Sequence, residues 1–329
     1  MTTICVDVMG SDCEPSVLLE GVAKALELDS ELKVLVAGDA SVVEPFARDH
    51  ERAEALVTTE VIAMDEHPAS AVRKKKDASI VRAASAVRAG QADGLFSAGS
   101  TGAVLTAATF GIGRIKGIRR PALTLAAPGI SGKKTVLLDC GANADVQPDA
   151  IVQFAHMGRA YAQVVLGVEE PRVALLCNGS EDTKGSELAL SYHKALAEGN
   201  CGFVGNAEGT DLLAGTFDVI VADGFTGNVA LKTIEGTAKF IVSRVKAAAG
   251  ESKRAGLGAL MLKPALKTVA GELSGDEMGG AVLLGLRAPV VKGHGSTSAE
   301  AVASGTLACA RAARGQLCER IAKACEKAE

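Results

Sequence analysis

The feature that most constrains this chain is a repeated alternation between short apolar segments and longer amphipathic ones. The apolar segments are runs of Val, Ile, Leu and Ala, and polar or glycine-rich turns separate them from segments with helical periodicity. Continuous apolar runs are typical of strands buried on both faces of a parallel sheet, and their alternation with helices indicates βαβ units. We expect strands at 3–8, 33–38, 57–63, 94–97, 121–126, 135–139, 172–176, 202–206 and 217–222, and helices at 15–28, 41–52, 78–89, 102–112, 148–166, 186–197, 228–248 and 297–313.

This pattern predicts an α/β fold, with a mostly parallel sheet and helices on both faces. The 329 residues suffice for one large domain of this kind, and we treat 1–329 as a single α/β catalytic domain. The segment 235–270 departs from the rhythm, because a long helical stretch is followed by a short apolar segment with basic flanks. We expect this segment to form a helical hairpin that protrudes from the domain.

Composition rules out several classes of protein. Hydrophobic residues make up 48% of the chain and charged residues 22%, close to the globular average, so the bulk of the chain cannot be disordered. The net charge is −4 and aromatic residues are only 3%, which argues against a nucleic-acid partner. We therefore expect a folded protein that binds no nucleic acid.

Motifs for metals, cofactors and export are missing. The eight cysteines show no CxxC or zinc-like spacing, and the N-terminus lacks a positively charged, signal-like segment, as expected for free thiols in the cytoplasm. No G-x-G-x-x-G follows a strand, and there is no Walker A sequence or G-x-S-x-G elbow. We expect no metal and no nicotinamide or ATP cofactor.

One strand-to-helix junction occurs twice. The segment from Asp93 to Val104 matches the segment from Asp218 to Val229, each residue of the second lying 125 positions after its counterpart. Both copies contain G-x-T-G, which would place backbone N–H groups and a threonine hydroxyl at a helix N-terminus, where phosphate binds well. Alternatively, the glycines only close the turn and the threonine only caps the helix. The repetition favours phosphate binding, and the candidate residues are Ser100, Thr101, Gly102, Thr226, Gly227 and Asn228.

Polar residues follow five apolar segments. Any one of them is a plausible cap or turn residue, but five such loops around one parallel sheet would converge on one crevice. They are Asp7 with Asp12, Asp139 with Asn143, Asn178 with Lys184, Asp223 with Asn228 and Lys232, and Lys292 with His294.

Two basic groups stand out on this acidic chain. Such runs are usually solvated surface, but they also suit an acidic partner protein or an anionic substrate. The first group is Arg73, Lys74, Lys75 and Lys76, and the second is Arg114, Lys116, Arg119 and Arg120.

The expected hairpin carries an apolar tip with a basic collar. This combination suits either a membrane surface or a partner subunit, and the residues alone do not decide between them. The tip is Leu257, Leu260, Met261 and Leu262, and the collar is Lys253, Arg254, Lys263 and Lys267.

These loops, in this order, resemble the PlsX family of bacterial phosphate acyltransferases, and the resemblance covers almost the whole chain. Each motif is weak alone, but together they are specific. They are DVMGSD at 7–12, AVRKKKD at 71–77, SAGSTGA at 97–103, LDCGAN at 138–143, GSE…KG at 179–185, GNAEG at 205–209, DGFTGNV at 223–229 and HGS at 294–296. The chain departs from the usual family pattern at Ser100, Cys140 and Ser186, where Asn, Val and Asn are usual.

The resemblance implies transfer of a fatty acyl group from acyl carrier protein to inorganic phosphate, which gives acyl phosphate for phospholipid synthesis. It implies a fold similar to phosphate acetyltransferases and isocitrate or isopropylmalate dehydrogenases. It also implies a cytoplasmic homodimer with peripheral membrane contact through the hairpin tip, and a downstream acyltransferase that uses acyl phosphate. Carrier proteins are acidic, so either basic group is a candidate docking site.

This reaction gives the candidate residues their roles. Phosphate must be held beside the thioester, the oxyanion stabilised and the leaving thiolate protonated. We place phosphate at the two helix N-termini with positive charge from Lys184, and the proton on His294. The Asn143 amide or backbone N–H groups serve the oxyanion, while Asp139 and Asp223 orient these groups.

Several alternatives stay open at this point. An acyl-enzyme on Cys140 is a rival route for the same reaction. An acyl-CoA-dependent phosphate acetyltransferase would share the fold, as would a metal- and nicotinamide-dependent decarboxylating dehydrogenase. A non-catalytic membrane scaffold would need the hairpin alone.

Overall fold

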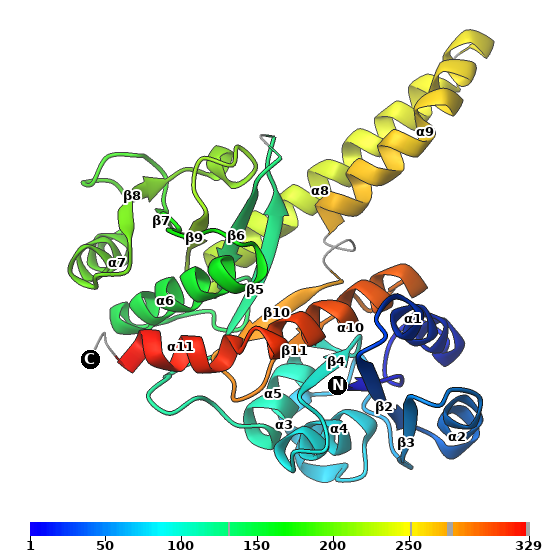
Figure 1. Ribbon diagram of the computed structural model, residues 1–329. Coiled ribbons are helices and arrows are strands. Elements are labelled where there is room, and N and C mark those ends of the chain that lie inside the picture. Colours follow the sequence, from blue (N-terminus) through cyan, green and yellow to red (C-terminus); the bar gives the residue numbers. More distant parts are fainter. Residues whose placement is uncertain (131, 251, 275–278, 327–329) are drawn as a thin grey trace.

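The computed structural model describes residues 1–130, 132–250, 252–274 and 279–326, which form an eleven-stranded sheet with helices on both faces (Figure 1). The strands lie in the order β3-β2-β1-β4-β11-β10-β5-β6-β9-β7-β8. Their bounds are β1 Thr2–Asp7, β2 Leu32–Gly38, β3 Ala53–Val57, β4 Gly94–Ser97, β5 Ala122–Pro128, β6 Lys134–Leu138, β7 Val173–Leu176, β8 Phe203–Ala207, β9 Val219–Val221, β10 Ala281–Leu284 and β11 Val290–Lys292. The α/β fold class expected from the sequence is confirmed.

Helices cover the two faces of the sheet unequally. One face packs on α1, α2, α6, α7, α10 and α11, and the other on α3, α4, α5 and the start of α8. The helices are α1 Pro15–Leu28, α2 Ala40–Asp49, α3 Pro68–Lys74, α4 Ser79–Arg88, α5 Thr101–Gly111, α6 Pro148–Val165, α7 Glu187–Glu198, α8 Gly224–Ala249, α9 Lys253–Ser274, α10 Ala299–Arg314 and α11 Leu317–Glu326, and a 3₁₀ turn spans Gly209–Leu212.

The sheet consists of two parallel halves that run in opposite directions. In the N-terminal half, β3, β2, β1, β4 and β11 are mutually parallel, and in the C-terminal half β6, β9, β7 and β8 are. Between them β10 and β5 pair antiparallel with their neighbours. The five polar loops therefore do not all leave the sheet at one edge, as a wholly parallel sheet would require. Figure 1 shows the two halves as lobes offset along a diagonal.

The strand register nevertheless brings the ends of both halves to the same level. Paired residues form a central row across the sheet. Most strands of both halves end at this row or one residue beyond it: β1, β4 and β11 in the N-terminal half, and β6, β9, β7 and β8 in the C-terminal half. The polar loops of the two halves thus start at the middle of the molecule and leave it in opposite directions. The row is Ala55, Val36, Val6, Phe96, Val291, Val282, Thr124, Leu138, Val221, Leu175 and Asn206.

Some elements differ from the sequence expectation. The third strand lies at 53–57 rather than 57–63, because it is an edge strand with a partly exposed face and lacks a continuous apolar run. The strands β10 and β11 were not expected, since both are very short. The helices α3 and α11 were also missed; α3 has only seven residues, and α11 follows α10 after a turn with Gln316 at φ 53.

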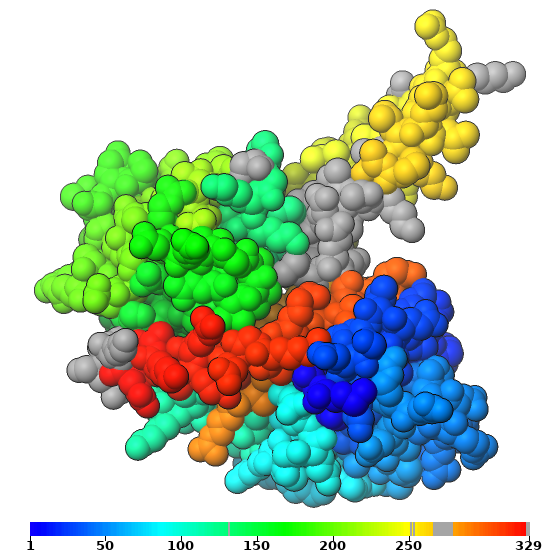
Figure 2. All heavy atoms as spheres, in the orientation of Figure 1, coloured from blue at the N-terminus to red at the C-terminus, as the bar shows by residue number. Residues whose placement is uncertain are grey.

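Helices α8 and α9 pack against each other and project from the lobes as a hairpin (Figures 1 and 2). The hairpin is longer than the expected segment 235–270, since α8 already begins at Gly224 beside the sheet. None of the helices within the described ranges is long and apolar enough to span a bilayer.

Candidate active site

The first group of polar side chains lies at the carboxyl ends of β1 and β4. The Asp7 carboxylate accepts hydrogen bonds from Ser97 Oγ at 2.8 Å and from the Met9 N–H at 3.1 Å. Burial raises the pKa of Asp7 to about 6, although these hydrogen bonds oppose the shift. Ser97 Oγ in turn accepts from the Gly99 N–H at 3.1 Å, so this pair fixes the loop that leads into α5.

The α5 turn keeps the arrangement expected for an anion site. Ser100 caps the helix, its Oγ accepting from the Ala103 N–H at 3.3 Å, so serine replaces asparagine here without loss of the cap. Thr101 and Gly102 follow at the first two helical positions, where backbone N–H groups have no partner within the helix. Gly102 lies under Pro68 of α3, and a Cβ on it would lie 2.4 Å from the proline ring.

The His294 loop belongs to the same half. His294 is exposed, and its Nδ1 accepts from the Ser296 N–H at 3.3 Å and lies 2.9 Å from Ser296 Oγ. A backbone N–H can only donate, so the neutral ring carries its proton on Nε2. The Asp12 N–H donates to the Gly295 carbonyl at 3.1 Å, which holds this loop against the one that follows β1.

A buried lysine ends β11 beside Ser97. Lys292 is 9% exposed, and within the described ranges no carboxylate forms an ion pair with it. Burial, together with the positive charge of Lys232 on α8, lowers its pKa to about 8, and Asp12 opposes the shift. In the sequence, the one signal for this role is a cation that directly ends an apolar run.

The second group begins at the carboxyl end of β6 with Asp139. This fully buried carboxylate accepts five hydrogen bonds, and burial still raises its pKa. The donors are the N–H groups of Leu123, Gly141, Ala142 and Asn143 and the Asn143 side-chain amide. Asp139 therefore organises the loop 139–143.

The Asn143 amide has no donor left for an oxyanion. Its Nδ2 donates to the Pro121 carbonyl at 2.7 Å and to Asp139 at 2.8 Å, which uses both hydrogens. The expectation that this amide stabilises the oxyanion is therefore wrong in this geometry. Its place is structural, since the Asn143 carbonyl also accepts from the Gly224 N–H at 2.8 Å.

The second G-x-T-G junction differs from the first. Asp223 caps α8, and its carboxylate accepts from the Thr226 N–H at 2.8 Å and from the Thr226 hydroxyl at 2.9 Å. Helix α8 consequently begins at Gly224, the counterpart of Gly99 in the first copy. Helix α5 begins two residues later in the repeat, at Thr101. A carboxylate at this position repels phosphate and occupies the groups that would bind it, so the two copies are not equivalent anion sites.

The glycines of that junction have a packing role. A Cβ on Gly224 would lie 2.3 Å from the Asn143 carbonyl oxygen, and one on Gly227 would lie 2.0 Å from that of Asp139. Real Cβ atoms do not approach so closely, so α8 reaches the loop 139–143 only because these positions are glycine.

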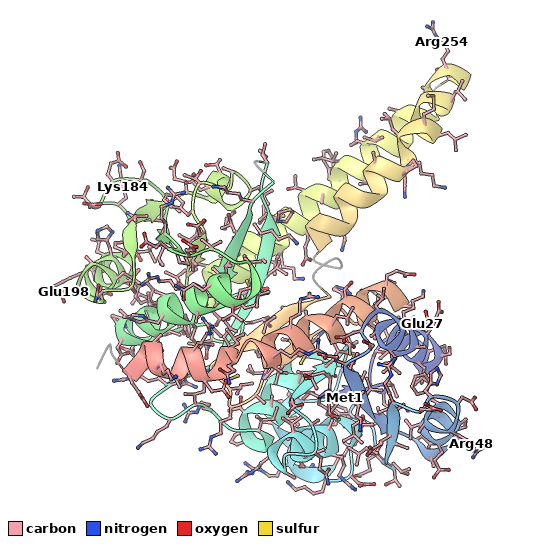
Figure 3. The ribbon with its side chains drawn as sticks, viewed as in Figure 1. Met1, Glu27, Arg48, Lys184, Glu198 and Arg254 are labelled. Carbon is pink, nitrogen blue, oxygen red and sulfur yellow. The ribbon has the colours of Figure 1, made fainter. Side chains whose placement is uncertain are left out.

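A cleft of about 310 Å³ lies at the carboxyl ends of β7 and β9. Asp223 and Thr226 line it together with Asn178, Gly185 and Ser186. Lys184 is exposed on the same loop next to this cleft, at the outer edge of the lobe that holds β7, β8 and α7 (Figure 3). The strand order separates it from Lys292, which ends β11 in the other half, and from His294, which follows that strand.

Helix α8 connects the two groups. Asn228 lies over Gly141 in the second group, and Lys232, one turn later on the same face, acts electrostatically on Lys292 in the first. Lys232 also pairs with Glu235, with 2.8 Å between Nζ and Oε2. The first three turns of α8 therefore carry polar side chains from one lobe to the other.

Cys140 does not fit the role of a nucleophile. It is 2% exposed, and its Sγ donates to the Leu137 carbonyl at 3.2 Å. Burial raises the pKa of this thiol well above its usual range, which disfavours the reactive thiolate. In the part of the chain that the structure describes, no three His, Cys, Asp or Glu residues come together as a metal site.

The basic groups are only partly available to a partner. Arg73, Lys74 and Lys76 are exposed at the end of α3, but Lys75 Nζ lies 2.6 Å from Glu66 and 2.7 Å from the Val61 carbonyl. Among the basic residues from Arg114 to Arg120, the guanidinium of Arg119 pairs with Asp149 at 2.6 Å.

Known proteins resemble this chain over nearly its whole length. Residues 2–320 match the family model described as fatty acid synthesis protein. A phosphate acyltransferase of Limosilactobacillus fermentum is 51% identical over 88% of this chain and 86% of its own length. Another, of Limosilactobacillus reuteri, is 48% identical over 91% of this chain and 89% of its own.

Solved structures show a similar fold at low identity. A phosphotransacetylase from Streptococcus pyogenes matches with a TM-score of 0.61 and 17% identity, over 96% of this chain and 94% of its own. A branched-chain phosphotransacylase from Enterococcus faecalis matches with a TM-score of 0.57 and 18% identity, over 94% and 99%.

The close contact between α8 and the loop 139–143 gives a direct test. Because its Cβ would clash with the Asp139 carbonyl, Gly227→Ala should lower the free energy of unfolding by roughly 2–3 kcal/mol. Gly236→Ala, in the same helix but facing open space, is the matched control and should raise it by up to about 1 kcal/mol. Urea unfolding measures both, and equal effects of the two variants would contradict the packing role.

Proposed function

The chain belongs to the fatty acid synthesis protein family, together with relatives named phosphate acyltransferase, and on that premise we propose that it transfers a fatty acyl group from acyl carrier protein to inorganic phosphate. Family membership makes it an acyltransferase that uses phosphate. The donor and the product, acyl phosphate, are our proposal. The similarity to these phosphate acyltransferases carries this proposal, and the α5 turn beside Lys292 supports it as a candidate site for phosphate.

Phosphate binds at the α5 turn in this proposal. The free N–H groups at Thr101 and Gly102 and the hydroxyl of Thr101 point to an oxyanion ligand, and Lys292 and Lys232 supply positive charge. A buried ammonium group without a carboxylate partner is stabilised when an anion binds beside it. The α8 turn at Thr226 and Gly227 is the weaker candidate, because Asp223 already occupies its donors.

The reaction then needs one bond exchange. A phosphate oxygen attacks the thioester carbonyl, the new C–O bond forms, and the C–S bond breaks. The hydrogen phosphate gives up its proton as it attacks, and His294 passes that proton to the departing thiolate, so the ring ends neutral as it began. With Asn143 committed elsewhere, the Asn228 amide is the side chain we assign to the oxyanion on the α8 side.

A hydroxylamine trap tests the reaction itself. Purified protein mixed with palmitoyl–acyl carrier protein and phosphate should give acyl hydroxamate, because hydroxylamine captures acyl phosphate. Omission of phosphate should abolish the product. If palmitoyl-CoA replaced the carrier-protein substrate with equal efficiency, the protein would act instead as an acyl-CoA-dependent enzyme, and the carrier-protein assignment would be wrong.

The phosphate assignment predicts a pH effect. A lysine with a lowered pKa loses its charge as the pH rises through about 8, so KM for phosphate should rise above that pH. Lys292→Gln should raise KM for phosphate about tenfold at pH 7 and remove the step near pH 8. A wild-type KM in Lys292→Gln would exclude phosphate from this position.

The basic end of α3 is our proposed docking site for the acidic carrier protein. Pro68 at the start of α3 covers the α5 turn, and Arg73 and Lys74 lie only about 8–9 Å further along the same helix from Pro68. Lys76 is exposed beside them, whereas Lys75 supports the docking site through its ion pair with Glu66.

The proposal also includes two partners. One is a second copy of this chain, which forms a homodimer, and the other is a downstream acyltransferase that consumes acyl phosphate.

The hairpin tip is our proposed membrane contact. Leu257 is 63% exposed and Met261 77%, and Leu260 and Leu262 lie beside them. Arg254 stands at the far end of the hairpin (Figure 3), and Lys263 is exposed near it, whereas the side chains of Lys253 and Lys267 lie outside the described residues. In such an arrangement the basic collar attracts anionic headgroups, while the apolar side chains inside it enter the acyl boundary.

Vesicle sedimentation tests this contact. The protein should sediment with phosphatidylglycerol vesicles, and Leu257→Glu/Met261→Glu should abolish sedimentation because charge is expelled from the acyl region. Leu28→Glu/Phe110→Glu is the matched control, since each of these residues is 73% exposed elsewhere on the surface. If the tip variant sedimented normally but its oligomeric state changed, the tip would be a subunit contact instead.

A further inference from the structure

A cavity of about 500 Å³ lies on the face of the sheet opposite to α5 and α8. It is bounded by α6, by the end of α7 and by α11, which packs along α6 (Figure 1). None of the residues to which we assign a role in the reaction lines it. Its volume is within the range of pockets that hold small ligands.

Three cations line this cavity against one carboxylate. Arg159 comes from α6, Arg320 and Lys323 lie three residues apart on one face of α11, and Glu198 ends α7. Within the ranges that the structure describes, none of the three cations has an ion-pair partner. An excess of cations without partners favours an anionic ligand.

The guanidinium of Arg159 is itself incompletely satisfied. Its Nε is buried and has no hydrogen-bond partner among the described residues. The guanidinium carbon of Arg159 would lie 3.1 Å from a Cβ at Gly202. The guanidinium therefore packs closely over the backbone of the loop that follows α7. A buried donor left without an acceptor is costly, so the protein leaves the hydrogen-bonding capacity of this guanidinium partly unused.

The remaining wall is polar and neutral. His156 Nε2 lies 3.2 Å from the Gly199 carbonyl and donates to it, and burial lowers the pKa of this histidine, so its ring stays uncharged near neutral pH. The amides of Gln163 and Asn200 also line the cavity. Together with the Glu198 carboxylate, these groups match hydroxyl groups rather than a second anion.

We propose that this cavity binds a small phosphorylated molecule that also carries hydroxyl groups. The phosphate lies among Arg159, Arg320 and Lys323, since guanidinium groups match phosphate oxygens in pairs. The hydroxyl groups donate to Glu198 and accept from Gln163 and Asn200. The proposal is independent of the acyl transfer, because the cavity lies on the other face of the sheet.

Calorimetric titration without any acyl donor tests the site. Wild-type protein should bind ribose 5-phosphate, and it should bind sulfate, a bare dianion, at least about tenfold more weakly. Arg320→Gln/Lys323→Gln should weaken ribose 5-phosphate binding about tenfold or more, and both residues are exposed enough to replace without unfolding. Arg48→Gln/Lys33→Gln is the matched control, with the same charge change at two exposed positions, and should bind as the wild type does. Arg48 lies far from Glu198 (Figure 3), and Lys33 is in β2, near the end of the strand order opposite to β7 and β8.

Results of three kinds would overturn the proposal. One is the absence of any binding of ribose 5-phosphate to wild-type protein, or an unchanged affinity in Arg320→Gln/Lys323→Gln. A second is equal affinity for sulfate and ribose 5-phosphate, which would leave only a site for bare anions. A third is loss of binding in Lys292→Gln, which would place the ligand at the catalytic phosphate position.

Discussion

Two strands in the middle of the sheet, β10 and β5, pair antiparallel with their neighbours, and the geometry of the whole site depends on this reversal. Parallel strands end at one edge, so an unreversed sheet would gather every polar loop on one rim. Here the two halves run in opposite directions, and their strands end at the same central row. Two groups of polar loops result, and α8 carries side chains from one to the other.

That connection rests on close backbone contact. Asp139 collects five hydrogen bonds and so shapes a tight loop, and Gly224 and Gly227 let the start of α8 lie directly on it. The position of α8 in turn places Asn228 over the loop and Lys232 where it acts on Lys292. A buried aspartate thus determines where Asn228 and Lys232 lie.

The repeated junction shows how alike sequences acquire different chemistry. The aspartates that precede the two strands behave identically, since Asp93 accepts from the Thr3 N–H and Asp218 from the Arg172 N–H, each at 2.8 Å. The helix starts differ because the second copy has Asp223 where the first has Ala98. One carboxylate caps the second helix and occupies its donors, so only the first copy keeps an open N-terminus.

The sequence by itself determined the α/β class, most of the strands and helices, and the family, because these depend on local periodicity and on motifs read along the chain. It also located the loops that carry Ser100, Asp139, Asp223 and His294. It could not determine which loops share a space, because the direction of β10 and β5 depends on pairing between segments more than a hundred residues apart. It also could not show that Asn143 has no free donor or that Lys292 is a buried cation. Hydrogen-bond partners and burial are properties of the packed molecule, and only the tertiary structure decided them.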